Sequence, residues 1–423
     1  LLFLIPFVDW GRPFSWGHLD LLALLSFSVS LAFFNHARIY ASVPLAYPPL
    51  IYLLLRMLAL ARSRRPSGRL RLPDGRRGTL MAFGVLFLLG FRVGLNVTDG
   101  NVIDVGYAGV IGAQRIVDGR PLYGGYPTEN EHGDTYGPVN YEAYVPAQEV
   151  FGWGGRWDDL PAAHAAAILF DLLAVGLLFL LGRRMRGPTL GLALAYAWVS
   201  YPFTLFALES NSNDVLVGDL VLAAILLAAS PPARGLFAAL AGLTKFAPLA
   251  LAPLLATHGL RGQPRRRAAR SLAGFLLAFA LTVALVCIPA LAHDSLRTIY
   301  ERTIEYQASR GSPFSVWGLY GLGGWQTAAQ IGVVLLALAL AILPRRPDLV
   351  GLSAAAAAIL ISTQLAIEHW FYLYIPWFFG AAMVALLGAA ASTVSPDAGA
   401  GAGAGGGEEE PGEGAGVPTP AAA

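Results

Sequence analysis

The sequence predicts an all-α protein that crosses a membrane about ten times and carries one large polar loop early in the chain. Hydrophobic residues make up 56% of its 423 residues and charged residues only 13%, a composition typical of polytopic membrane proteins. Apolar runs of the ~17 to 25 residues that cross a bilayer recur along the chain. The segment 97–160, by contrast, is polar.

The expected spans follow one another with short connections. They lie near 19–34, 39–60, 79–96, 161–182, 188–207, 214–230, 271–291, 326–343, 349–367 and 371–390. The opening LLFLIPFVDW lacks a charged n-region, so we expect the end of a further span rather than a signal peptide. Pro248 and Pro253 interrupt the apolar segment 235–257. A re-entrant or interfacial hairpin and an ordinary proline-kinked span both fit that pattern.

Arginine-rich loops predict which ends of the spans share a side of the membrane. The arginine-rich segments, expected on the cytoplasmic side, are 62–77 with seven arginines, 182–186 with three, 261–270 with five and 344–346 with two. The segments expected on the outer side are 97–160, 208–214, 293–312 and 368–370. These sides alternate correctly if 235–257 does not cross. Lys245, the only lysine, is then expected near the cytoplasmic leaflet, where it would anchor the hairpin to lipid phosphates.

Composition divides the chain into three parts. Residues 1–78 hold the N-terminal spans and a basic loop, 79–390 hold the remaining spans, and 391–423 form a Gly/Ala/Glu/Pro-rich segment without apolar periodicity. Such a segment cannot repay the entropy of folding, so we expect a disordered tail. The single cysteine, Cys287, excludes an intramolecular disulfide and a cysteine-based zinc site.

The polar loop 97–160 begins with two carboxylates just beyond a span, Asp99 and Asp104. Apolar residues at helical spacing after Asp104 predict an amphipathic helix over about 104–117, lying on the outer leaflet surface. Tyrosines and tryptophans follow, and these suit both the lipid interface and stacking on sugar rings. A solvated loop aspartate is the alternative interpretation of Asp104.

Four stretches together resemble the C superfamily of glycosyltransferases, and family 87 in particular. The first is Asp104 followed by Gly119, Pro121, Tyr123, Tyr136, Gly137, Pro138 and Tyr141; the others are SNSNDVLVGDLVLAA at 210–224, LTKFAPLALAPLL at 243–255 and IEHWFYLYIPWFF at 367–379. The resemblance covers roughly 79–390. It departs from the family at Tyr136-Gly137-Pro138, where Y-P-P is usual, and in the spans before residue 79.

The resemblance implies an integral-membrane enzyme that moves a hexose, mannose above all, from a polyprenyl-phosphate donor to an extracytoplasmic glycan or glycolipid, with inversion. A bacterial plasma membrane and an extracytoplasmic site are expected, with no cofactor and no nucleic acid. It gives Asp104 the place of the catalytic base, and Asp99 is the second choice. The remaining candidates are Arg92, His369 and Arg302 for the donor phosphate and Tyr107, Tyr136, Tyr141, Asn213 and Asp214 for substrate.

Other functions stay open at this point. Glu129, Glu131, His132 and Asp134 in ENEHGD could bind a divalent cation, although acidic runs are usually solvated. A transporter or flippase of lipid-linked sugars would use carboxylates inside the spans, and Asp171 is one. A polysaccharide polymerase or ligase would usually carry its large loop late in the chain, whereas this loop comes early.

Overall fold

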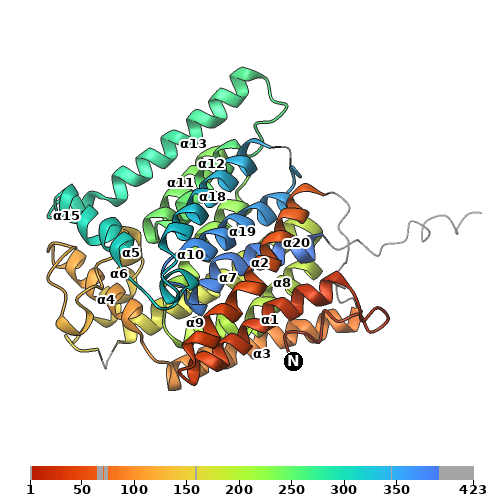
Figure 1. Ribbon diagram of the computed structural model, residues 1–423, viewed down its shortest axis with the longest axis horizontal. Coiled ribbons are helices and arrows are strands. Elements are labelled where there is room, and N and C mark those ends of the chain that lie inside the picture. Colours follow the sequence, from red (N-terminus) through yellow and green to blue (C-terminus); the bar gives the residue numbers. More distant parts are fainter. Residues whose placement is uncertain (1, 64–69, 71–74, 158–159, 344, 390–423) are drawn as a thin grey trace, which may run out of the picture. The chain divides into compact units, whose positions relative to one another are not determined.

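The computed structural model describes residues 2–63, 70, 75–157, 160–343 and 345–389, and these residues form helices and no strands (Figure 1). The expected tail at 391–423 lies outside the described residues. Residues 1–390 form one compact unit. The all-α prediction is therefore confirmed for the described part of the chain.

Long apolar helices make up the body of this unit. Among the described residues, seven helices are long and apolar enough to cross a membrane: α1 (Trp16–Asn35), α2 (Ile39–Arg62), α3 (Gly75–Asp99), α7 (Pro161–Arg186), α13 (Arg265–Val286), α18 (Gly323–Ile342) and α19 (Leu349–Ala366). An eighth span is possible if α8 (Pro188–Ser200) and α9 (Pro202–Glu209), bent by 58°, count together. The multi-pass prediction holds.

The count of about ten spans is not confirmed. α10 (Asp214–Leu226) has 13 residues and α20 (Ile375–Gly388) has 14, so each rises only ~20 Å. A bilayer core is ~30 Å thick. Both helices are almost completely buried in the bundle.

Short helices gather at one end of the bundle. In the first loop they are α4 (Asp104–Val117), η1 (Thr128–Asn130), α5 (Pro138–Glu142) and α6 (Val145–Phe151); later in the chain they are α14 (Ile288–Leu291), α15 (Leu296–Tyr300), the π-helical turn η3 (Glu301–Glu305), α16 (Tyr306–Ser309), α17 (Val316–Leu319) and η4 (Tyr372–Tyr374). Figure 1 shows α4, α5, α6 and α15 together at this end.

Helix α4 begins and ends where the sequence predicts. Its apolar residues, however, do not form a face left free for lipid: Val105 to Ala113 are all buried. α5, α6 and α7 pack on α4, and Gly109 and Gly112 admit the rings of Tyr144 and Tyr141, which a Cβ would displace. The apolar spacing of α4 thus reflects packing against other helices of the protein and not a face exposed to lipid.

The predicted division of loops between two ends is confirmed. At one end, the Arg346 amide donates to the Ala61 carbonyl (2.8 Å) and the Arg184 guanidinium donates to the Leu226 carbonyl. At the other end, the Asn101 amide donates to the Glu209 carbonyl (2.8 Å). The described residues of the basic segments therefore share one end, which we call the arginine end. The acidic and aromatic segments share the other, which we call the polar end.

The segment 231–257 is a hairpin. α11 (Pro231–Thr244) leads away from the arginine end, and η2 (Ala247–Leu251) with α12 (Ala252–Thr257) returns to it, because the guanidinium of Arg234 donates to the carbonyl of His258. Of the two alternatives, the re-entrant hairpin is correct. Its tip carries Lys245, which contacts Asp214 at the polar end of α10, so the expected cytoplasmic position of Lys245 is wrong.

The N-terminal helices belong to the same unit as the rest. α2 packs on both α1 and α19, a buried ion pair joins Arg56 to Asp20 at 2.9 Å, and Ser30 and Ser42 both hydrogen-bond the hydroxyl of Tyr372. Residues 2–7 form turns rather than the end of a span and bury Phe3 and Phe7. The boundary at residue 78 therefore marks where the family resemblance begins, not a gap in packing.

Candidate functional site

A cavity of about 710 Å³ opens at the polar end, between the hairpin tip and the loops around it. Its walls come from residues 135–136, the hairpin tip 245–247, the segment 307–311, the region of α17 and the start of α18, the loop 367–369, and Tyr374 with Trp377. Segments more than 200 residues apart in the chain meet here, as the separation of 135 from 377 shows. A site of this composition is invisible to local sequence motifs.

Lys245 is the most enclosed cation of this cavity. Its side chain is only 8% exposed, and Nζ lies 2.5 Å from Oδ1 of Asp214. The rings of Tyr136, Tyr374 and Trp377 surround the ammonium with centroids 5.3, 5.1 and 5.4 Å away. Quadrupoles of aromatic rings attract a cation, and a buried charge needs such compensation. The cage therefore compensates the buried ammonium at the cavity wall.

Asp214 anchors this cage rather than contacting substrate. The residue is fully buried and accepts hydrogen bonds from Trp377 Nε1 (2.7 Å) and Ser212 Oγ (2.8 Å) as well as from Lys245. It is not part of the cavity wall. In this structure its carboxylate positions Lys245.

Arg310 supplies a second cation. The side chain is half-buried and lines the cavity. Among the described residues, no group accepts a hydrogen bond from its guanidinium or forms an ion pair with it. A guanidinium without a protein partner can donate two parallel hydrogen bonds to an anion with two oxygens, such as a carboxylate or a phosphate.

His369 lines the cavity, as predicted, but it is not a cation near neutral pH. Burial lowers its pKa to about 4, and the nearby charges of Arg310 and Lys245 act in the same direction. Nδ1 lies 2.8 Å from the hydroxyl of Ser312. A neutral imidazole offers no charge to a phosphate, but it can still hydrogen-bond a ligand through Nε2.

Tyr136 connects the cavity to the first loop. The ring lines the cavity, and burial raises its pKa well above 10, with the nearby carboxylates of Asp104 and Asp214 adding to the shift. Asp104 itself is exposed on the first turn of α4, where Oδ1 accepts a hydrogen bond from the Val105 amide at 2.9 Å. The Asp104 carboxylate is therefore solvent-accessible and acts electrostatically on Tyr136, but it does not itself line the cavity.

Gly137 explains the departure from Y-P-P. A Cβ at this position would overlap the carbonyl oxygen of Leu243, in the last turn of α11. The backbone at 136–137 therefore presses directly against the hairpin tip. This contact fixes Tyr136 relative to Lys245.

Arg92, a candidate for the donor phosphate, does not line the cavity. Its side chain is 1% exposed, and its Nε and Nη2 donate to the two carboxylate oxygens of Asp171 at 3.1 and 2.5 Å. Nη1 donates to the Val199 carbonyl and the Thr204 hydroxyl. The guanidinium is committed to the protein, and little of it remains for a phosphate.

The presence of a carboxylate inside the bundle at Asp171 is explained by the same ion pair. Its carboxylate accepts from Arg92 and from Trp198 Nε1 at 2.8 Å. A carboxylate with these partners is a structural group. The residue that supported the transporter alternative therefore no longer does so.

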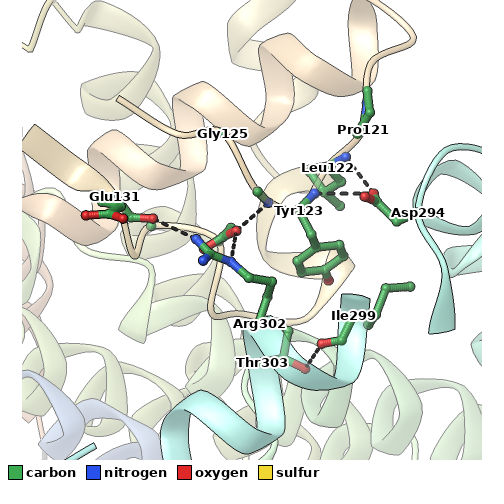
Figure 2. A network of polar contacts seen from close by, with 12 residues as sticks. Pro121, Leu122, Tyr123, Gly125, Glu131, Asp294, Ile299, Arg302 and Thr303 are labelled. Carbon is green, nitrogen blue, oxygen red and sulfur yellow. Dashed lines mark hydrogen bonds and ion pairs between the residues drawn. The ribbon is translucent and has the colours of Figure 1, made fainter. Parts of the chain in front are cut away.

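Arg302 holds two loops together instead of lining the cavity. Its Nε and Nη2 donate to the carboxylate of Asp134 at 2.6 and 2.8 Å, and Nη2 also donates to the Glu131 carbonyl. Nearby, Asp294 accepts from the amides of Leu122 and Tyr123. Figure 2 shows Arg302 and Asp294 reaching from one segment toward the 121–131 loop. These contacts occupy much of the Arg302 guanidinium and position the segment that leads to Arg310.

The remaining predicted residues lie away from the cavity wall. Tyr107 and Tyr141 are fully buried: Tyr107 stacks on Trp157, and the Tyr141 hydroxyl donates to the Gly133 carbonyl at 2.9 Å. Asn213 is buried and donates to Asn140. Asp99 is exposed at the end of α3. The first three have structural roles, and the structure brings Asp104, not Asp99, near Tyr136.

The ENEHGD residues have partners of their own. Tyr107 donates to Glu129, Arg302 pairs with Asp134, and His132 stacks on Tyr306 with centroids 4.5 Å apart. Among the described residues, no three His, Cys, Asp or Glu side chains converge in a way that could hold a metal ion. These contacts stabilise the loop.

The fold and the cavity define a multi-pass membrane protein with a ligand site at the polar end of its helix bundle. The sequence model of Glycosyltransferase family 87 matches residues 157–367, about half of the chain. The chain belongs to glycosyltransferase family 87, of the C superfamily, as the resemblance predicts. The matched segment contains Lys245 and Arg310, while Asp104, Tyr136 and His369 lie outside it.

Solved structures and curated protein sequences say less about this chain than the family model does. The crystal structure of ArnT from Cupriavidus metallidurans bound to undecaprenyl phosphate is similar to 73% of this chain at 18% identity, with a TM-score of 0.47. The aligned region spans 59% of the ArnT chain. No curated protein sequence matches this chain.

Proposed function

We propose that the chain is an integral-membrane glycosyltransferase that moves a hexose from a polyprenyl-phosphate donor to a glycan or glycolipid acceptor. Membership of family 87 supports this class of reaction. The observation that carries the proposal is the pairing, in one cavity, of the caged Lys245 with Arg310, whose guanidinium has no protein partner among the described residues. Two cations at a cavity wall favour an anionic ligand.

The two cations have complementary roles in binding the donor phosphate. Arg310 offers a planar fork to two phosphate oxygens, and Lys245 contributes a point charge held by its aromatic cage. Negative charge grows on the bridging oxygen as the sugar leaves, and preorganised cations stabilise that charge. His369, neutral near pH 7 because its pKa is about 4, supplies a hydrogen bond rather than a third charge.

Asp104 is the proposed base. The acceptor hydroxyl attacks the anomeric carbon and forms the new C–O bond, while the bond from that carbon to the phosphate oxygen breaks. The polyprenyl phosphate leaves with the electron pair, and the hydroxyl proton passes to the Asp104 carboxylate. One displacement inverts the anomeric configuration, in contrast to double displacement by paired carboxylates.

The proposed donor sugar is mannose and the proposed location is a bacterial plasma membrane, both from the family resemblance. The arginine end lies opposite the cavity, and arginines favour the cytoplasmic side. This distribution supports an extracytoplasmic site, with donor and acceptor entering from the outer leaflet.

Transfer by two carboxylate variants tests the proposal. Purified protein would be assayed with radiolabelled polyprenyl-phosphate mannose and a panel of glycan and glycolipid acceptors. Asp104→Asn should bind donor normally but lose about 10²- to 10⁴-fold in rate, the usual contribution of a positioned base. Asp99→Asn, a matched change on an exposed carboxylate five residues away, should stay near wild type. Normal transfer by Asp104→Asn would exclude it as the base.

A further inference from the structure

Glu368 places a carboxylate in the wall of the same cavity. The side chain is half-buried, and among the described residues no group donates a hydrogen bond to it or forms an ion pair with it. Neither Lys245 nor Arg310 pairs with it, although all three line one cavity. An unpaired carboxylate close to two cations needs an explanation, because attraction should otherwise draw them together.

The surroundings of Glu368 differ from those of the cations. Oε1 approaches Gly318 so closely that a Cβ there would clash with it, and Glu368 is near enough to Tyr47 of α2 to act on it electrostatically. The charge of Arg310, in contrast, acts on His369 and on Tyr136. The cavity therefore has a cationic part at the hairpin tip and an acidic part beside α17.

The acidic part is rich in planar polar groups. Gln307, Gln326 and Gln330 line the cavity with Glu368, as do Thr327 and the ring of Trp317. The indole N–H of Trp317 is already bonded to the Leu365 carbonyl at 2.9 Å, which fixes the ring. Amides and a carboxylate offer donors and acceptors in pairs, and the face of a fixed aromatic ring suits the apolar face of a sugar.

We propose that Glu368 binds hydroxyl groups of the donor sugar and makes the site select neutral hexoses over hexuronic acids. This inference rests on the proposed function and names the substrate class. With the donor phosphate at Lys245 and Arg310, the sugar extends toward Glu368, where its hydroxyls donate to the carboxylate. A sugar carboxylate in that place would meet a like charge in a partly desolvated site, which disfavours binding.

The test compares two synthetic donors, polyprenyl-phosphate hexose and polyprenyl-phosphate hexuronate, for wild type and Glu368→Gln. Wild type should prefer the hexose by about 100-fold or more in kcat/KM, since like charges across an interface cost several kcal/mol. Glu368→Gln should lower kcat/KM for the hexose by about 10- to 100-fold, the loss of a charge-assisted hydrogen bond, and should reduce the preference at least tenfold. Glu149→Gln, an exposed glutamate outside the cavity wall, is the matched control and should change neither value.

Four results would overturn the inference. Equal use of both donors by wild type, or a preference unchanged in Glu368→Gln, would show that Glu368 does not select the sugar, while transfer itself would leave the proposed function intact. Loss of kcat beyond about 10³-fold with unchanged donor binding would make Glu368 the base instead. Absence of transfer from every donor by wild type would overturn the proposed function, and this inference with it.

Discussion

Lys245 shows how a buried ion pair can serve both structure and ligand binding. The ammonium is held by Asp214 at 2.5 Å and by three aromatic rings, yet it also lines the cavity. Removing one partner of such a pair leaves the other charge buried and uncompensated, which costs about 3 to 5 kcal/mol. A single substitution at Lys245 therefore confuses loss of stability with loss of binding.

A double substitution separates the two effects. Lys245→Met should lower thermal stability in detergent because Asp214 stays charged without its partner. Lys245→Met combined with Asp214→Asn should recover most of that stability, because a neutral amide replaces the unpaired carboxylate. Donor affinity should stay about 100-fold weaker in both variants, because the cation is absent from both. Recovery of donor binding in the double variant would show that Lys245 only supports the fold.

The pH dependence of donor binding tests the neutral state of His369. Its folded pKa of about 4 lies below the ordinary 6.5, so folding favours the neutral form and opposes protonation between those values. Donor affinity should therefore change less than about twofold between pH 8 and 5.5, measured as Kd for wild type and His369→Gln. Tighter binding on acidification through pH 6.5 that disappears in His369→Gln would indicate an imidazolium–phosphate contact instead.

At the residue scale, sequence reasoning found the loop but not most of the cavity. Asp104, Tyr136 and His369 could be predicted because motifs place them just outside spans. The protein partners of Arg92 and Arg302 could not be predicted, because pairing with Asp171 or Asp134 depends on contacts about 80 and 170 residues away, as the separations of 79 and 168 show.

The sequence spacing around Lys245 contains a signal for its position that the charge pattern does not reveal. Lys245 follows Arg234 by eleven residues and precedes Arg261 by sixteen. A helix rising 1.5 Å per residue therefore carries it ~16 Å away from the arginine end. The prolines after it mark the hairpin tip. Counting residues from the basic ends would have placed this lysine deep in the bundle, near the polar end.

At the scale of elements, the hairpin α11–α12 determines the depth of the cavity. α11 has 14 residues and so rises ~21 Å, less than a ~30 Å bilayer core. A hairpin of this length does not reach across a bilayer core, so Lys245 lies at its tip within the bundle. Irregular backbone at that depth is tolerated where it lines a cavity or is buried in protein. The short hairpin thus creates room for a ligand inside the bundle.

The contact between Gly137 and the hairpin can be tested with alanine. Gly137→Ala should push Tyr136 away from the tip, because a Cβ would overlap the Leu243 carbonyl, and should weaken donor affinity about tenfold or more through the disturbed cage. Gly154→Ala is the control: it lies in the same loop with open space around it and no positive φ. Equal donor affinity in the two variants would argue against a role for this contact.

The helices themselves were more predictable than their packing. Periodicity gave α4 its correct bounds, Asp104–Val117, because the same apolar spacing arises whether the face meets lipid or protein. It could not distinguish these two environments. The short buried helices α10 and α20 show a related limit, because hydropathy reports an apolar environment and not a length across the bilayer.

At the scale of the whole molecule, the arrangement has a basic end and a ligand-binding polar end. Charge distribution along the sequence predicted this division correctly, because each arginine-rich loop joins the ends of neighbouring spans. The central claim is that the cavity at the polar end binds a lipid-linked sugar phosphate through Lys245 and Arg310. That claim depends on the position of two cations and not on which sugar is transferred.

Donor binding by two arginine variants tests the central claim most directly. Kd for polyprenyl-phosphate mannose would be measured with Arg310→Ala and with Arg297→Ala, whose guanidinium is exposed and already paired with Glu301 at 2.6 Å. We expect Arg310→Ala to bind about 100-fold more weakly, since truncating one partner of a desolvated charge pair costs ~2 to 5 kcal/mol, and Arg297→Ala to bind like wild type. Wild-type affinity in Arg310→Ala, or equal losses in both variants, would contradict the assignment of this cavity as the donor site.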